Sequence, residues 1–152
     1  MNEIHISYPA IQEIAAKGVR RTAVFIGLGL NAALDPNFKA YELTQITSIQ
    51  LVPPDADEKT LSHYKEQFSL WITACGLREL METFAVFLDE VHQASLLIAA
   101  SSRKLSINDI AIQDKKYRQK GIKEKLDLLK QKFNIESKNP EALKTIHQTR
   151  NC

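Results

Sequence analysis

The side chains best suited to catalysis or metal binding are scattered along this sequence. Its four histidines form no H-x-x-x-H or H-E-x-x-H pair, the spacings that bring two ligands to one side of a helix. Two cysteines are too few for a disulfide framework, and no Walker loop or G-x-S-x-G elbow occurs. We therefore expect no metal site and no cofactor. We also expect His63 and His92 to lie on a surface or at an interface.

Positive charge is concentrated in the last third of the chain. Residues 101–152 carry 13 of the 20 Lys and Arg residues and 6 of the 18 Asp and Glu residues. Such an asymmetry is typical of surfaces that face nucleic acid, where each lysine adds a salt-sensitive contribution. A solvated helix face that keeps the protein soluble explains the same pattern. If RNA or another nucleic acid binds here, the expected contacts are Lys116, Lys120, Lys123 and Lys130.

A third group of polar residues lies at the end of the sequence. Asn139-Pro140-Glu141 is a strong signal for a helix start, and Arg150-Asn151 follows on the same predicted helix. A positive charge in the last turn of a helix is favoured by the helix dipole alone. The dipeptide therefore has a structural explanation as well as a functional one.

Arg150-Asn151, the segment WITACGLRELMETFAVFLDEVH and the helix pair KLDLLKQKFNI and PEALKTIHQTRNC resemble the HEPN superfamily (higher eukaryotes and prokaryotes nucleotide-binding). The resemblance covers about residues 45–152. In that family a histidine follows the arginine by four to six residues. The resemblance implies metal-independent RNA cleavage, in which this histidine transfers protons, Arg150 binds the scissile phosphate and Asn151 orients the phosphate or its partner residues.

No histidine follows Arg150 in these 152 residues. We expect an endoribonuclease only if the natural chain continues to such a histidine, and an inactive relative otherwise. The resemblance implies an RNA-cleaving module of a prokaryotic toxin or antiviral defence system, with a cognate antitoxin or defence-system partner and with two protomers sharing one cleft. The alternative is a non-catalytic helical dimerisation or interaction module, or a basic nucleic-acid-binding domain. We expect a homodimer.

The longest predicted element runs from Asp57 to about Ala100. Its apolar residues recur at steps of three or four and no proline interrupts them, which predicts one amphipathic helix or two collinear ones divided near Gly76. At a rise of about 1.5 Å per residue this segment would reach roughly 60 Å. Asp89 and Glu90 have the spacing of an exposed helix face.

Two further helices and two connections complete the prediction. A first helix starts near Pro9, and residues 23–34 are apolar on nearly all sides, so this part should be buried or paired with another chain. Residues 41–54 favour an extended segment, and residues 101–114 favour a connection. A third helix is predicted over 115–133, with buried Ile122, Leu126, Leu129 and Phe133 and with exposed lysines that include Lys125.

The composition is ordinary for a globular protein, with 44% hydrophobic and 25% charged residues. We expect residues 1–152 to form a single all-α domain, an antiparallel helical bundle with about four main helices and one long central helix. No apolar run approaches the roughly 20 residues that span a bilayer. We therefore expect a cytoplasmic protein without a membrane partner.

Overall fold

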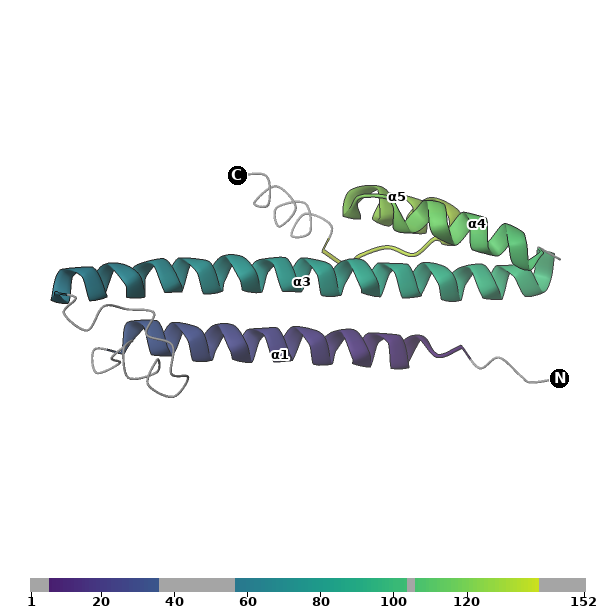
Figure 1. Ribbon diagram of the computed structural model, residues 1–152. Coiled ribbons are helices and arrows are strands. Elements are labelled where there is room, and N and C mark those ends of the chain that lie inside the picture. The colour runs from purple at the N-terminus through teal and green to yellow at the C-terminus, as the bar shows by residue number, and fades with distance from the viewer. Residues whose placement is uncertain (1–5, 36–56, 104–105, 140–152) are drawn as a thin grey trace. The chain divides into compact units, whose positions relative to one another are not determined.

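The computed structural model describes residues 6–35, 57–103 and 106–139, and every regular element in these ranges is an α-helix (Figure 1). The prediction of an all-α fold is confirmed. The expected extended segment at 41–54 and the expected last helix from Pro140 lie outside the described residues. The helices are α1 (Tyr8–Leu34), α3 (Glu58–Arg103), α4 (Ile107–Arg118) and α5 (Ile122–Phe133).

The two longest helices follow the predicted ranges closely. α1 starts one residue before Pro9, which suits a first helical turn because proline has no N–H to leave unpaired. α3 continues for 46 residues and Gly76 does not interrupt it. At its start, Asp57 accepts a 2.8 Å hydrogen bond from the backbone N–H of Thr60, as expected for an N-cap.

The prediction of one helix over 115–133 is wrong, as is the prediction of a connection before it. α4 already starts after Ser106, because Ser106 and Asp109 form a capping box with hydrogen bonds of 3.1 and 3.3 Å. α4 ends in a turn in which the Lys120 N–H donates to the Tyr117 carbonyl at 3.0 Å. α5 then begins after Gly121, whose N–H donates to Glu124 at 3.3 Å.

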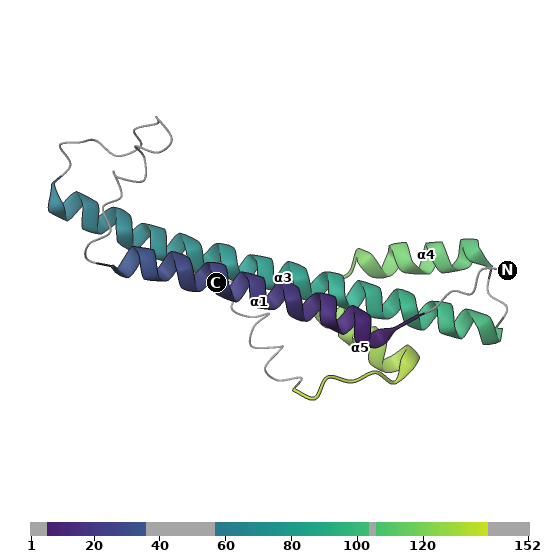
Figure 2. The same ribbon diagram turned by 90° about the horizontal axis from the view of Figure 1, so that it is seen from below.

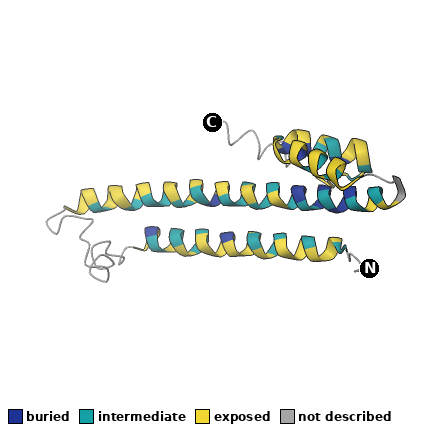
Figure 3. Cartoon of the chain, turned by 45° about the vertical axis from the view of Figure 1, so that its right-hand side comes forward, coloured by how far each residue is buried: buried dark blue, intermediate teal, exposed yellow. Residues whose placement is uncertain are grey.

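The described helices divide between two compact units. Of the described residues, unit 1 contains 6–16, 83–103 and 106–139, and unit 2 contains 17–35 and 57–82. The buried residues of unit 1, dark blue in Figure 3, gather where the second half of α3 meets α4 and α5. The apolar ones are Leu88, Val91, Ala94, Leu96, Tyr117, Ile122 and Leu129. The prediction that residues 1–152 form one domain stays a prediction.

Unit 2 consists, in its described part, of an antiparallel pair of helical segments that lie side by side in Figures 1 and 2. Gly29 of α1 packs on Ile72 of α3, where an added Cβ would lie 2.8 Å from the Ile72 side chain. Gly76 of α3 likewise packs on the Ile26 side chain of α1. We call these four residues the helix contact. Without Cβ atoms at its two glycines, the backbones approach closely.

One test of membrane insertion is met by α3. Its segment Glu58–Ser101 is long and apolar enough to cross a bilayer by length and composition alone. The core helix of a soluble protein meets the same test, and 39% of the apolar window is buried inside the protein. One such helix is weak evidence for a membrane protein, and the cytoplasmic location stays a prediction.

Candidate functional site

An exposed apolar surface of unit 2 lies beside the helix contact. The residues that directly precede the four contact residues are Phe25 and Leu28 on α1 and Trp71 and Cys75 on α3. One residue turns a helix by about 100° around its axis. Because the two segments are antiparallel, all four side chains flank the contact on the same side. Phe25, Leu28 and Trp71 are 62%, 63% and 60% exposed.

Two more aromatic residues extend this surface along α3. Tyr64 and Phe68 precede Trp71 at helical steps of four and three, so their side chains continue the same line. The rings of Phe68 and Trp71 are stacked with centroids 6.3 Å apart. The resulting surface carries no formal charge. We call it the aromatic face, and its members are Phe25, Leu28, Tyr64, Phe68, Trp71 and Cys75.

A second group of side chains forms a buried polar cluster in unit 1. The group links α3 to α4 and α5, and it includes three residues that we expected on exposed faces. Asp89, His92 and Lys125 are instead buried, with 7%, 2% and 4% of their surface exposed. These three predictions are wrong. The members of the buried polar cluster are Asp89, His92, Asp114, Tyr117, Arg118 and Lys125.

His92 is held between aromatic rings. Its imidazole stacks on Tyr117 with ring centroids 3.7 Å apart and planes within 1° of each other. Phe133 of α5 packs edge-on at 5.9 Å. The His92 Nδ1 atom lies 3.5 Å from Asp114 Oδ1, too long for a strong hydrogen bond. The histidine therefore fills the junction of three helices mainly as an aromatic residue.

An ion pair crosses the same junction from α3 to α5. Lys125 Nζ lies 2.7 Å from Asp89 Oδ1, and both side chains are largely withdrawn from water. Lys125 also lies 5.6 Å from the centre of the Tyr117 ring. The Tyr117 hydroxyl donates a 3.1 Å hydrogen bond to the backbone carbonyl of Lys125, which anchors α4 to α5. Each charge buried here thus has an opposite charge as its partner.

Arg118 closes the cluster on its exposed side. Its Nε atom donates a 2.7 Å hydrogen bond to Asp114 Oδ2, one turn earlier on α4. Its Nη2 atom lies 3.6 Å from Glu90 and 3.4 Å from Gln93, both on α3. These charge-assisted contacts tie the last turn of α4 to α3.

The environment shifts the pKa values of three members. Burial lowers the pKa of His92, although the Asp114 carboxylate, 3.5 Å away, opposes this effect through its weak contact and its negative charge. Burial, with a smaller contribution from Asp89, raises the pKa of the Tyr117 hydroxyl. The hydrogen bond to Asp114 raises the pKa of Arg118. We conclude that His92 and Tyr117 are neutral and Arg118 is charged at neutral pH.

The chemistry available to this cluster is limited. A histidine beside an aspartate is part of many catalytic sites, but a side chain that is only 2% exposed cannot reach a substrate in this conformation. In the part of the chain that the structure describes, no three His, Cys, Asp or Glu side chains are arranged to hold a metal ion. The cluster therefore acts as a structural connection between helices.

Sequence spacing contained a signal for these buried polar residues. His92 follows the buried Leu88 by four positions and precedes the buried Ser95 by three, so it belongs to the apolar stripe of α3. On α5, Lys125 follows the buried Ile122 by three positions and precedes the buried Leu129 by four. Periodicity placed both side chains inward, whereas their polarity suggested the opposite.

The structure describes the predicted RNA-contacting lysines but not the predicted catalytic residues. Arg150 and Asn151 lie outside the described residues, so their roles stay predictions. Of the four lysines, Lys116, Lys123 and Lys130 are exposed, and Lys120 is half-buried. Lys120 Nζ lies 3.9 Å from Glu124, and Lys130 Nζ lies 3.1 Å from Glu136. Two of the four positive charges are thus partly neutralised by neighbours.

If RNA binds these lysines, the unpaired ones should contribute most. We expect the double variant Lys116→Gln/Lys123→Gln to weaken RNA binding and to lower the slope of log affinity against log salt by about 1.4, since each phosphate contact on a single strand contributes about 0.7. Titration of a labelled single-stranded RNA at several salt concentrations measures this slope. The matched variant Lys120→Gln/Lys130→Gln should have a smaller effect. Equal slopes for all three proteins would contradict the assignment.

Comparison with known proteins adds no family assignment to this geometry. No protein-family model matches the chain, and neither the curated proteins nor the solved structures include one with significant similarity to it.

Proposed function

We propose that this protein is a helical interaction module that pairs with a second copy of itself through the aromatic face of unit 2. The observation that carries the proposal is the exposure of large apolar side chains on both helices of the pair. Phe25, Leu28 and Trp71 are each at least 60% exposed. Apolar surface of this kind is typical of binding sites, with aromatic residues at their centre.

The composition of α1 favours an interface over a free surface. Residues 23–34 are apolar around nearly the whole helix, and only Thr22 and Ala33 of the segment 17–34 are buried. A helix that is hydrophobic on all sides needs partners on more than one side. α3 supplies one such partner, and a second copy would supply another. Two helix pairs placed face to face make a four-helix bundle.

A second copy suits the aromatic face because the face is uncharged. In a two-fold symmetric dimer each patch meets its own copy, so a patch with a net charge would meet the same net charge. The six members of the aromatic face carry none. Charged residues begin at its border, where Arg21 pairs with Glu79 at 2.9 Å across the two helices. The face can therefore meet itself without electrostatic repulsion.

The only tryptophan of the chain makes pairing directly measurable. Trp71 is 60% exposed in a single copy, so dilution should shift its fluorescence emission to longer wavelength as dimers dissociate. We expect Trp71→Lys to reduce dimer affinity at least 100-fold, because it places a charge at the centre of the interface. Sedimentation equilibrium over a range of concentrations measures the average mass of the wild-type protein and of the variant.

Leu70→Lys provides the matched control. Leu70 is 59% exposed and adjacent to Trp71, but it points about 100° away from the aromatic face. We expect this variant to dimerise normally. A wild-type protein that is monomeric at every concentration would contradict the proposal, whatever the emission wavelength of Trp71. If the emission of that monomer were also blue-shifted, the face would be covered by other residues of its own chain. Equal effects of Leu70→Lys and Trp71→Lys would also contradict it.

The RNA-cleaving role implied by the HEPN resemblance remains a separate prediction. It depends on Arg150, Asn151 and a histidine that the sequence does not contain. Pairing through the aromatic face depends on none of these residues.

A further inference from the structure

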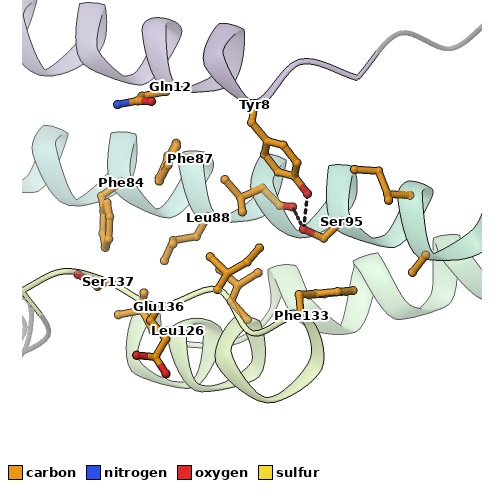
Figure 4. Close-up of a pocket in the computed structure, with 15 residues that line it drawn as sticks. Tyr8, Gln12, Phe84, Phe87, Leu88, Ser95, Leu126, Phe133, Glu136 and Ser137 are labelled. Carbon is orange, nitrogen blue, oxygen red and sulfur yellow. Dashed lines mark hydrogen bonds between the residues drawn. The ribbon is translucent and has the colours of Figure 1, made fainter.

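A large pocket in unit 1 lies between the start of α1, the second half of α3 and the end of α5 (Figure 4). Its volume is about 900 Å³, which is in the range of small-molecule sites. Most of its wall is aromatic or aliphatic, and Figure 4 shows Phe84, Phe87 and Leu88 lining it from α3 and Leu126 and Phe133 from α5. The aromatic face of unit 2 contributes no residue to it.

The chain after α5 completes the wall. Asn134 adopts a left-handed conformation with φ of 55°, and the N–H groups of Asn134 and Ile135 bond back to the Lys130 and Leu129 carbonyls. This helix end reverses the chain direction. Ile135, Glu136 and Ser137 therefore border the pocket.

Two hydroxyl groups determine the polarity of one side of the pocket. Ser95 donates its single proton to the Val91 carbonyl at 2.7 Å. The 2.9 Å hydrogen bond between Ser95 and Tyr8 must therefore be donated by the Tyr8 hydroxyl (Figure 4). Both protons are thus committed within the protein. The pair presents only oxygen lone pairs to a ligand.

The charge of the residues that line the pocket also favours a ligand that donates hydrogen bonds. Glu136 is the one charged residue among the described residues that line the pocket, and its carboxylate can only accept hydrogen bonds when ionised. No lysine, arginine or histidine lines it within those residues. A ligand carboxylate would thus meet oxygen lone pairs from the lining, and the Lys130 ammonium beside Glu136 is already paired with that carboxylate at 3.1 Å. Gln12 and Ser137 can accept as well as donate and do not alter this preference.

We propose that this pocket binds an apolar molecule that carries a hydrogen-bond donor, such as an aliphatic alcohol. The aliphatic part lies against the aromatic and aliphatic wall. The donor group bonds to the oxygen atoms of Tyr8 and Ser95. An uncharged acceptor of the same shape binds more weakly, because the two hydroxyl protons are already used.

Displacement of the fluorescent apolar probe N-phenyl-1-naphthylamine from the full chain tests the proposal. We expect 1-decanol to displace the probe at about fivefold lower concentration than decyl methyl ether, which lacks only the donor; this ratio corresponds to one net hydrogen bond. Decanoate should bind more weakly than 1-decanol. Equal displacement by all three compounds would overturn the proposal.

Two variants locate the ligand. Ser95→Ala frees the Tyr8 hydroxyl proton, which the ether oxygen can then accept. The ether should gain affinity, and the ratio of the displacing concentrations of ether and 1-decanol should fall towards one. An unchanged ratio would overturn the assignment of the donor. Ala99→Phe adds a side chain to the pocket wall and should reduce binding of 1-decanol at least tenfold. Ala100→Phe changes a neighbouring residue outside the lining and should not. Equal binding by both phenylalanine variants would place the probe elsewhere and overturn the proposal.

Two further results separate this inference from competing explanations. Trp71→Lys should retain binding of 1-decanol, because the pocket lies in unit 1; loss of binding would overturn the proposal without affecting dimerisation. Residues 140–152 follow directly after the described chain and contain Leu143 and Ile146. If the wild-type chain fails to bind the probe but Leu143→Ser/Ile146→Ser binds it, the occupant is the protein itself. The proposal would then be wrong.

Discussion

Replacing Lys125 with methionine is expected to lower the free energy of unfolding by about 3 kcal/mol, since removal of one partner leaves the other charge buried and uncompensated. Asp89 would lose the ammonium group that lies 2.7 Å away, and its side chain is only 11% exposed. Methionine preserves the length and the apolar part of the lysine side chain. Urea denaturation followed by circular dichroism measures the change.

A double-mutant cycle assigns this effect to the ion pair. We expect Asp89→Leu/Lys125→Met to recover most of the lost stability, because an apolar pair of similar volume often replaces a buried ion pair without cost. Lys130→Met removes an exposed pair with Glu136 and should cost less than about 1 kcal/mol. If Lys125→Met were no more harmful than Lys130→Met, the buried pair would have no structural importance.

Stability should decrease as the pH falls below about 6.5, and His92 should account for part of that decrease. Burial lowers the pKa of folded His92 below the ordinary value of 6.5, so the unfolded chain takes up a proton first. The contribution of neutral His92 is therefore complete above pH 6.5. It decreases at up to about 1.4 kcal/mol per pH unit as the pH falls, and it stops changing below the lowered pKa of the folded state.

Two variants isolate this contribution from other titrating groups. His92→Phe keeps an aromatic ring against Tyr117 and removes the titration, so its unfolding free energy should depend less on pH below about 6.5. His63→Gln removes an exposed histidine of the same helix and serves as the control. Parallel profiles for wild type and His92→Phe would show that burial does not disfavour the charged imidazole.

The two long helices could be predicted because their signals are local and continuous. α1 and α3 have apolar residues at helical steps, and proline is absent from α3. The division of residues 115–133 was missed for an equally local reason. The apolar stripe from Ile122 to Phe133 predicts a helix but not its first residue. Ser106 and Asp109 have the spacing of a capping box, a start signal that the polar character of the surrounding segment obscured.

The pairing of charges in the buried polar cluster could not be predicted from the sequence. His92 and Lys125 occupy inward positions by spacing, but a polar side chain at such a position is stable only if a partner compensates for the loss of water. Asp89 lies 36 positions before Lys125, and no local pattern connects them. Only the packing of α5 against α3 brings their charges together.

The sequence by itself determined the all-helical class and the ranges of α1 and α3, because backbone hydrogen bonds and apolar periodicity act within a few residues. It also indicated that residues 23–34 require partners. Tertiary structure alone decided which polar groups are buried and that Phe25, Leu28 and Trp71 share one face. It also decided which way the Tyr8 and Ser95 protons point. These features depend on contacts between residues distant in sequence, where burial and pairing outweigh the preferences of single residues.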